Sequence, residues 1–479
     1  MHKKVSKRTL LVRRIVVYTL MVSVTTSLVT IMVLVMLGYR FNKDSNTIQQ
    51  GGLVQFISKP SGANITIGHA KLANKTPTKI TVNPGQYRVT MQRDGYKPWQ
   101  KMVEVGAGKL LWLNYAQLVP TTITTTPVKK LDDVAQAVTS PSGRLVAYTT
   151  NTAPYELALL NVRSGDFNVQ KVATGLVPNK GYQNGVTLRE WSGDDQRLLA
   201  TRTMPRGTEW LYIDSDVSQP AVNLSATYGI AIKSASFDPR SADKVIILAE
   251  NGELYTVNTG SRTLPAAAAR GVLSYSVVNR QHILYRYKDT AGEQKIGYVS
   301  LDKTEGRELP VDAKTVQYVS ATSYFNIYYI AVARNDELSI YRMNDMPSST
   351  VGSSALAATL VTSQKIRSVP TGLSWQTGGR MAVVEHADGY DAYDNELGTF
   401  STTKYVNASK VTLRWLDEYH VYYYSKSGLE VAEFDGGNPY TIKEAAGLTA
   451  ALSNDGTYLY SIAKTGSTYS LLQSRMILP

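Results

Sequence analysis

The 479-residue sequence predicts an all-β protein with a single membrane-spanning helix near its N-terminus. Three observations lead to this prediction. Residues 15–39 form an uncharged apolar run of 25 residues, and short runs of alternating apolar and polar residues begin at residue 53. From residue 131 onward, a pattern of strands and turns recurs roughly every 37–51 residues. The chain has no cysteine, which excludes disulfides, thiolate metal sites and cysteine nucleophiles.

The apolar run from Ile15 to Tyr39 predicts a membrane anchor, with Gly38 and Tyr39 at the interface. As a helix it would be about 38 Å long, enough for a hydrocarbon core of roughly 30 Å. A cleaved signal peptide is the alternative, but its apolar region would be shorter and would end in small residues, and no alanine precedes Ala63. The basic tail 1–14 predicts a cytoplasmic N-terminus, a single-pass topology in the cell membrane, and extracytoplasmic C-terminal domains. The topology-setting cations are Lys3, Lys4, Lys7, Arg8, Arg13 and Arg14.

The net charge of +13 is concentrated near the predicted membrane. Residues 51–120 carry nine cations and two acids, whereas residues 121–479 carry 34 cations and 35 acids. This surplus is typical either of a solvated basic surface or of a surface that faces cell-wall polymer or anionic lipid headgroups. No nucleic-acid partner is predicted. The candidate envelope contacts are Lys71, Lys75 and Lys79.

After a polar, unpatterned linker at 40–51, residues 52–120 predict a small β-sandwich. Its alternating strands are expected at 53–58, 63–67, 79–82, 86–93, 100–105 and 110–118. Four short motifs follow one another here: Pro60-Ser61-Gly62-Ala63, Thr76-Pro77, Pro84-Gly85-Gln86-Tyr87 and Gly95-Tyr96-Lys97-Pro98-Trp99. Together they resemble a PEGA domain, with Ser61 in place of the family's glutamate. The resemblance implies a non-catalytic β module of bacterial envelope proteins.

Residues 121–130 predict a stiff Thr/Pro linker, and residues 131–479 predict a β-propeller. Each repeat has a strand ending in a large apolar residue, then a turn and further strands. Eight blades are expected, with seven as the alternative because the copies near 275 and 320 have poor turns. The last repeat lacks an outer strand, and residues 124–131 are expected to supply it. Three repeats resemble the Trp-Ser-Pro-Asp-Gly blades of WD40-like, TolB-type propellers: Val138–Gly143, Trp191–Asp195 and Leu452–Gly456.

Large apolar residues occupy the same place in four repeats, which favours packing between blades over a stacking site for sugars. These residues are Trp191, Phe237, Trp375 and Trp415. The acidic segment 386–396 predicts a hairpin turning at Asp388 and Gly389, with its acids toward solvent, rather than a calcium site. The five histidines lack ligand spacing, and neither a nucleophile elbow nor a phosphate loop occurs. No catalytic residue, metal or cofactor is therefore predicted.

These features predict a non-enzymatic, membrane-anchored envelope or surface protein. Its PEGA-like module would contact the cell wall or the membrane surface, and its propeller would bind a protein or glycan partner. Two alternatives remain open. One is an extracytoplasmic propeller enzyme that cleaves glycans or peptides, which would need paired carboxylates about 5–9.5 Å apart. The other is an envelope sensor or assembly scaffold.

Overall fold

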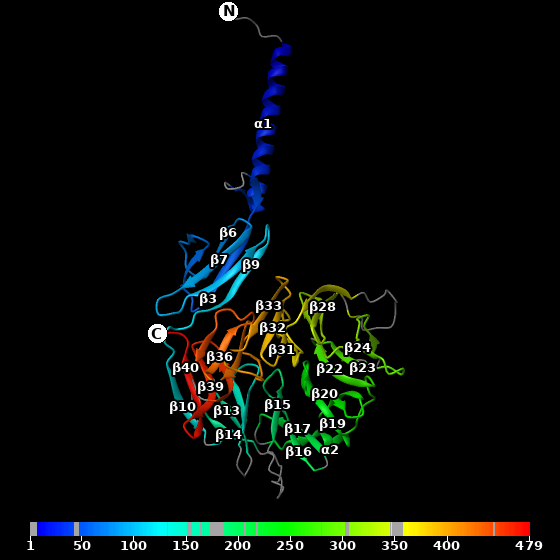
Figure 1. Ribbon diagram of the computed structural model, residues 1–479. Coiled ribbons are helices and arrows are strands. Elements are labelled where there is room, and N and C mark those ends of the chain that lie inside the picture. The colour runs from blue at the N-terminus through cyan, green and yellow to red at the C-terminus, as the bar shows by residue number, and fades with distance from the viewer. Residues whose placement is uncertain are drawn as a thin grey trace, which may run out of the picture. The chain divides into compact units, whose positions relative to one another are not determined.

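The computed structural model divides the chain into two units, Met1–Thr121 and Thr122–Pro479 (Figure 1). The structure describes residues 7–42, 47–131, 133–150, 156–162, 165, 167–172, 186–205, 207–216, 219–278, 280–301, 306–344, 346, 358–443 and 446–479.

The first unit begins with helix α1, Lys7–Met36. Its segment Leu11–Met36 has a mean hydropathy of 2.1 and is not buried against the rest of the protein, so it is long and apolar enough to cross a membrane, as a signal sequence also can be. The hydroxyls of Thr25 and Thr30 donate to carbonyls four residues earlier, which satisfies them within the helix. The helix ends three residues before the predicted Tyr39, because Gly38 adopts a left-handed conformation (φ 82°).

The expectation of an unpatterned linker at 40–51 is wrong in part. Strand β1 (Tyr39–Asn42) pairs with β2 (Thr47–Gln50) in an antiparallel hairpin. The Gly51 N–H then donates to the Gly38 carbonyl at 2.9 Å, which joins the end of the hairpin to the end of the helix. Residues 43–46 lie outside the described part of the chain.

The rest of the first unit is a two-sheet β-sandwich, and its strands match the predicted runs. One sheet has the order β6-β3-β9 and the other β5-β4-β7-β8, with β3 and β9 parallel. Alternate residues of each long strand face inward, and Trp99 packs edge-on against Tyr115 at 6.1 Å between ring centroids. The strands are β3 (Gly52–Lys59), β4 (Asn64–Ile67), β5 (Ala70–Lys71), β6 (Thr78–Val82), β7 (Gly85–Gln92), β8 (Trp99–Val105) and β9 (Leu110–Gln117).

The second unit is a β-propeller built from antiparallel sheets of three or four strands, and eight such sheets lie in its described residues (Figure 1). A blade number of eight stays a prediction for the whole ring. Seven sheets run in chain order: β11 (Gln136–Thr139), β12 (Leu145–Thr149), β13 (Leu157–Asn161) and β14 (Val169–Lys171); β15 (Thr187–Trp191), β16 (Arg197–Met204), β17 (Gly207–Asp214) and β18 (Val222–Asn223); β19 (Ile232–Asp238), β20 (Ser241–Ala249) and β21 (Leu254–Asn258); β22 (Val272–Val278), β23 (His282–Lys288), β24 (Gln294–Ser300) and β25 (Arg307–Glu308); β26 (Tyr318–Tyr324), β27 (Ile327–Ala333), β28 (Glu337–Met343) and β29 (Thr359–Lys365); β30 (Gly372–Trp375), β31 (Met381–His386), β32 (Gly389–Asp394) and β33 (Thr399–Lys404); β34 (Arg414–Trp415), β35 (His420–Ser425), β36 (Gly428–Glu433) and β37 (Tyr440–Ile442). A short helix, α2 (Leu224–Tyr228), follows β18.

The eighth sheet joins the two ends of the unit. It consists of β38 (Gly447–Leu452), β39 (Tyr458–Thr465), β40 (Thr468–Arg475) and, from the start of the unit, β10 (Thr125–Leu131). Strand β10 pairs antiparallel with β40, and the Thr125 and Ser474 hydroxyls are 2.7 Å apart. This is the outer strand that the sequence predicts from 124–131. The pairing covers the edge of β40 that would otherwise be open.

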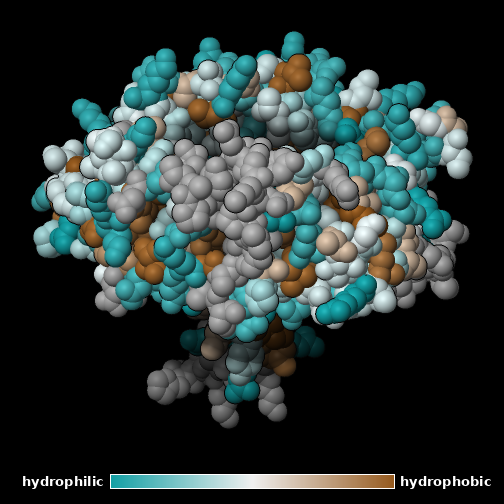
Figure 2. Space-filling model, turned by 90° about the horizontal axis from the view of Figure 1, so that it is seen from below, coloured by the Kyte–Doolittle hydropathy of each residue, from teal (hydrophilic) through white to brown (hydrophobic). Residues whose placement is uncertain are grey.

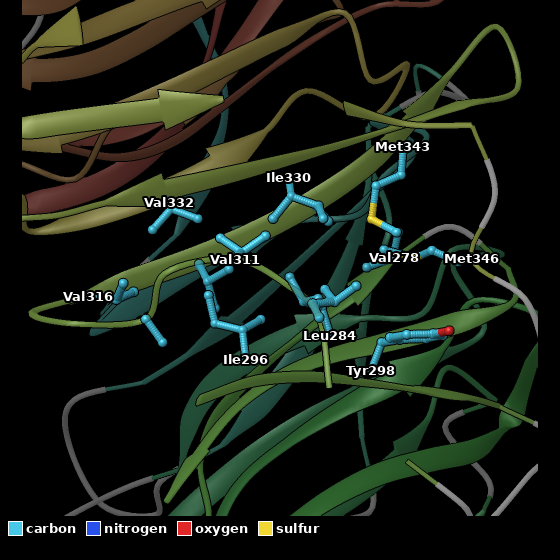
Figure 3. Packing of buried hydrophobic residues seen from close by; sticks show 14 residues of the cluster. Val278, Leu284, Ile296, Tyr298, Val311, Val316, Ile330, Val332, Met343 and Met346 are labelled. Atoms are coloured by element: carbon cyan, nitrogen blue, oxygen red, sulfur yellow. The ribbon is translucent and has the colours of Figure 1, made fainter. Parts of the chain in front are cut away.

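Neighbouring sheets share apolar clusters, which hold the ring together. Figure 3 shows one of them between the sheets that begin with β22 and β26. Leu284 and Tyr298 come from the first of these sheets, and Ile330 and Met343 from the second. The first strand of several sheets also contacts the first strand of the next, as for β38 with β11 and β22 with β26. The first strands therefore surround the centre of the ring.

The three repeats that best match the Trp-Ser-Pro-Asp-Gly pattern share one hydrogen bond. The serine at the start of the turn accepts from the backbone N–H five residues later. Ser140 accepts from Leu145 at 3.1 Å, Ser192 from Arg197 at 2.8 Å, and Ser453 from Tyr458 at 2.9 Å. These bonds fix the turns that join the first and second strands of their sheets.

A candidate ligand cavity inside the propeller

A cavity of about 630 Å³ opens inside the ring, within the size range of small-ligand sites. Five sheets contribute to its wall: it is bounded by the first strands β11, β15, β34 and β38, by the turns that follow β11, β30 and β34, and by Tyr422 of β35. Because sheets from both ends of the unit contribute, the cavity requires the closed ring. The side chains that can bind a ligand are mostly polar: Gln136, Thr139, Ser142, Arg189, Gln376, Thr377, Arg414, Trp415, Asp417, Glu418 and Thr449.

Several wall residues are held by contacts between neighbouring sheets. The Gln136 amide donates to the Leu188 carbonyl at 3.1 Å and accepts from the Leu188 N–H at 2.8 Å. The Thr139 and Thr449 hydroxyls lie 2.8 Å apart across the junction of the first and last sheets. At the rim, Ser142 hydrogen-bonds to the buried carboxylate of Asp195 in the next sheet. Contacts within the protein therefore hold these wall residues in place without a ligand.

Two arginines, Arg189 and Arg414, and two acids, Asp417 and Glu418, line the cavity. Arg189 is exposed, and its Nε donates to the Thr201 hydroxyl at 3.0 Å. Arg414 is partly buried, and one terminal nitrogen donates to the Leu448 carbonyl at 2.6 Å. Within the described residues, neither guanidinium forms an ion pair with a carboxylate. Terminal N–H groups of both side chains are thus available for an anionic group of a ligand.

The two acids at the rim differ in their surroundings. Asp417 accepts from the backbone N–H groups of Tyr419 and His420 and from His420 Nδ1, each at 2.8–2.9 Å. Burial raises the pKa of Asp417, but the hydrogen bond and charge of His420 outweigh it and leave the pKa below its ordinary value. Both residues lie at the surface, and Asp417 is an ionised turn cap.

A second polar group lies on the first strands β15, β19 and β22. Burial raises the pKa of Glu190 to about 7, although N–H and hydroxyl donors from Phe237 and Ser236 oppose the shift. The Tyr275 hydroxyl is 3.0 Å from Ser236 Oγ and 3.1 Å from the Ile246 carbonyl. Burial also raises the pKa of Tyr275. The inner wall thus continues as a polar surface past the cavity, a feature that strand periodicity does not indicate.

The four repeated aromatic positions all lie where two sheets meet. Trp191 and Phe237 are buried against the preceding sheet, and the Trp191 ring N–H donates to the Val138 carbonyl at 3.2 Å. Trp375 and Trp415 are partly buried against the clusters shared with the preceding sheet. Trp415 differs from the others because it also lines the cavity. The same side chain can therefore pack between sheets and offer part of its ring to a ligand.

The acidic segment 386–396 does form a hairpin, but the expectation that its acids face solvent is wrong for the two acids of strand β32. Asp391 and Asp394 are fully buried. Asp391 accepts from His386 Nε2 at 2.9 Å, and Arg380 contacts Asp394 at 2.8 Å and Glu396 at 2.5 Å. Arg380 thus compensates the charges of Asp394 and Glu396, while Asp391 is held by its hydrogen bond with His386. In the described residues, no three His, Asp or Glu side chains gather in a way that could hold a metal ion.

The histidines that begin strands are buried rather than at exposed edges. His282 lies between the rings of Tyr298 and Tyr328, at 5.9 and 5.8 Å between centroids. His420 caps the turn through Asp417, as described above. Both roles are explained by packing and turn geometry.

In the first unit, Lys71, Lys75 and Lys79 are all exposed. Gly62 and Gly95 of the motif segments have φ near 84°, a conformation that favours glycine. Ala63 and Tyr96, which follow them, are buried. Gly85 follows Pro84 and begins β7. Of the topology-setting cations, Arg8, Arg13 and Arg14 lie in α1, with Lys7 as its first residue. Lys3 and Lys4 lie outside the described residues.

Comparison with solved structures returns propellers at low sequence identity. The C-terminal WD40 domain of Sif2 is 12% identical with a TM-score of 0.48, covering 74% of this chain and 98% of that one. Dipeptidyl peptidase 4 of Porphyromonas gingivalis is 13% identical with a TM-score of 0.46, covering 73% and 60%. The computationally designed Ika8 protein is 13% identical with a TM-score of 0.44, covering 74% and 98%.

A search of curated proteins finds no match to this sequence. The family models give one match, over residues 52–121, which spans the β-sandwich of the first unit. The motif residues quoted above, including Pro60 and Gly95, fall within it. The match and the sandwich agree with the resemblance drawn from the sequence. Residues 52–121 are thus a PEGA domain, which the chain combines with an apolar N-terminal helix and a β-propeller.

Proposed function

We propose that this chain is a non-enzymatic, membrane-anchored envelope protein whose propeller binds an acidic glycan and whose PEGA domain contacts the envelope surface. The PEGA domain and the propeller fold support a surface or envelope protein. The helix α1 would remain uncleaved and hold the chain in the cell membrane, with the C-terminal units outside. The cavity inside the propeller is the observation that carries the proposal.

The composition of the cavity favours a glycan. A sugar ring has an apolar face and a rim of hydroxyls, so it suits an aromatic ring beside polar side chains. Trp415 supplies part of an aromatic face, and Gln376 and Thr377 supply polar groups. Arg189 and Arg414 would bind a carboxylate or phosphate group on the glycan. Hydrogen bonds to a charged group contribute about 1.5–3 kcal/mol each, which sets the expected effect of removing one.

The test measures binding of purified acidic wall glycan to the ectodomain, residues 42–479, by calorimetry. Arg189→Gln should weaken binding about tenfold, since 1.4 kcal/mol is a factor of ten. Thr377→Trp, which fills the exposed rim, should abolish it. The matched controls are Arg270→Gln, an exposed arginine in the loop before β22, and Ser467→Trp, in the exposed β39–β40 turn; both variants should bind as the unmodified protein does. If neither Arg189→Gln nor Thr377→Trp affected binding, the cavity would be ruled out as the binding site. Binding of an acidic peptide in preference to the glycan would indicate a protein partner instead.

The basic surface of the PEGA domain supports the envelope contact. Exposed charges act over a Debye length of about 10 Å at 0.1 M salt and about 3 Å at 1 M, so the contact should weaken as salt rises. Co-sedimentation of the ectodomain with wall material at low and high salt measures it. Replacing three PEGA lysines with glutamine should reduce the pelleted fraction at low salt, and the same change at three exposed propeller lysines should not. The PEGA set is Lys71, Lys75 and Lys79, and the control set is Lys314, Lys404 and Lys426. Equal effects of both sets would show that the PEGA domain does not make the envelope contact.

A further inference from the structure

Exposed apolar side chains gather where the first unit leaves helix α1. They come from the β1–β2 hairpin and from the start of strand β9, two segments far apart in the sequence. Large hydrophobic residues of a soluble domain are usually covered, so an exposed group beside a membrane anchor indicates contact with lipid. The group consists of Phe41 (60% exposed), Ile48 (65%), Leu110 (45%) and Trp112 (46%).

Backbone hydrogen bonds hold these residues close to the end of the helix. The Gly51 N–H donates to the Gly38 carbonyl at 2.9 Å, and the Gly108 N–H donates to the Gly51 carbonyl at 3.2 Å. Two successive backbone hydrogen bonds therefore link the turn before β9 to Gly38, which follows the end of α1. Arg40 strengthens the joint, because one of its terminal nitrogens donates to the Thr81 carbonyl of the PEGA sheet at 2.9 Å. Phe41 and Ile48 pair directly across the hairpin.

The register of the PEGA sheet shows that the exposed residues of β9 share one face. Leu53 is opposite Leu110, and Gln55 is opposite Trp112, in the parallel pairing of β3 and β9. Val54 and Phe56, on the other face of β3, are fully buried in the core of the sandwich. Leu110 and Trp112 thus project from the outer face, at the end of the sheet that adjoins the helix.

The distances match the thickness of the bilayer interface. A headgroup layer is about 5–8 Å deep on each side of the hydrocarbon core. Trp112 is two residues beyond Leu110, or about 7 Å along the strand. With β9 along the membrane normal, Leu110 would lie at the depth of the headgroups and Trp112 near their outer edge, where tryptophan is enriched in membrane proteins. Exposed Arg40 and Lys109 flank the group and can reach lipid phosphates.

We propose that the PEGA domain docks on the bilayer that holds its own anchor, through Phe41, Ile48, Leu110 and Trp112. The occupant of this face is the lipid interface, because the face continues the surface of the membrane-spanning helix. This contact rests on the proposed anchoring by α1. It would hold the PEGA domain at a fixed tilt on the membrane, and would leave the lysines of β5 and β6 as a separate contact with the wall.

The absence of cysteine from the chain makes a spin-label test direct. Single cysteines replace Ile48, Leu110, Lys59 or Val24 in the full chain, which is reconstituted in nanodiscs of phosphatidylcholine and phosphatidylglycerol (3:1) and labelled. Power-saturation EPR then compares the accessibility of each label to oxygen, which partitions into lipid, and to a water-soluble nickel complex. Lys59, at the far end of β3 and about 23 Å from Gly52, is the aqueous control. Val24, inside α1, is the lipid control.

The oxygen-to-nickel ratio should be several-fold higher at positions 48 and 110 than at position 59. Adding Trp112→Gln should lower the ratio at position 110 toward that of position 59, while Met102→Gln, an exposed apolar residue of the other sheet, should leave it unchanged. Ratios at 48 and 110 equal to that at 59, with a high ratio at 24, would overturn this inference and leave the anchor intact. A low ratio at 24 would instead refute the anchor.

Discussion

Replacing Glu190 with glutamine should stabilise the protein at pH 8 and have little effect at pH 5. Glu190 lies on β15, partly buried, and its carboxylate accepts a long hydrogen bond of 3.4 Å from the Phe237 N–H. Burial raises its pKa from 4.5 to about 7. Glutamine keeps an acceptor at this position and carries no charge at any pH, so the substitution removes the cost of ionising a buried carboxyl.

The sign follows from proton binding in the two states. Between pH 4.5 and pH 7 the folded protein retains a proton that the unfolded chain has released, so the stability of the unmodified protein falls as pH rises through this window. Above pH 7 the loss is complete. The interval between the two pKa values corresponds to roughly 3 kcal/mol, and the partial exposure of the side chain reduces the expected gain to about 2 kcal/mol.

The assay is urea unfolding of the full chain in detergent micelles at pH 5 and pH 8. The unfolding midpoint of Glu190→Gln should exceed that of the unmodified protein at pH 8 and nearly equal it at pH 5. Glu418→Gln, at an exposed turn beside the cavity, is the control and should show no such dependence on pH. An equal gain at both pH values would show that the effect comes from packing or hydrogen bonding, and would refute the assignment of a buried, proton-retaining Glu190.

Three further substitutions test the packing of the propeller. Leu131→Ala truncates a buried side chain of β10 and should lower the free energy of unfolding by about 3 kcal/mol in a denaturation curve, whereas a loss below 1 kcal/mol would show that β10 contributes little to closure. Arg380→Met leaves the buried carboxylate of Asp394 uncompensated and should cost about 3–5 kcal/mol; adding Asp394→Leu should recover much of this, and no recovery would point to a role other than charge pairing. Asp391→Asn should reduce the loss of stability that the protein shows as pH falls below the ordinary carboxyl pKa. Burial raises the pKa of Asp391, but the His386 hydrogen bond outweighs burial and leaves the pKa lowered, so the ionised carboxylate adds stability that is lost as pH falls. An unchanged loss of stability at acidic pH would contradict this.

Strand periodicity predicts much of this fold because each repeat carries its own signals. The runs beginning at Leu145, Leu198 and Tyr458 became second strands, since each follows a turn whose serine binds the N–H of the strand's first residues. The closing strand was predictable for a different reason. The last repeat ended one strand short, and an open edge requires a partner, which the β-branched segment after Thr124 supplies.

Local patterns failed where a distant residue decided the outcome. The acids of segment 386–396 follow an Asp388-Gly389 turn signal, which indicates a hairpin with its acids on the solvent face. Asp394 is nevertheless fully buried, because Arg380, which precedes the second strand of its sheet, reaches its carboxylate with two hydrogen-bonded nitrogens. The linker after the helix also lacked an apolar pattern, yet it forms a hairpin because Phe41 and Ile48 meet only after the chain reverses. Charge pairing and chain reversal both act beyond the reach of a period-two pattern.

The cavity shows why a binding site of this kind is the last feature to be predicted. Its lining comes from five repeats, and each contributes residues that look like ordinary strand ends or turns. Arg189 and Arg414 are 225 positions apart and occupy different places within their repeats, so no spacing rule connects them. They line one cavity because the ring closes through β10 and brings the last sheets beside the first. The residues that close the ring therefore also assemble the site, and a substitution that opens the β10–β40 pairing should weaken ligand binding without touching the cavity wall.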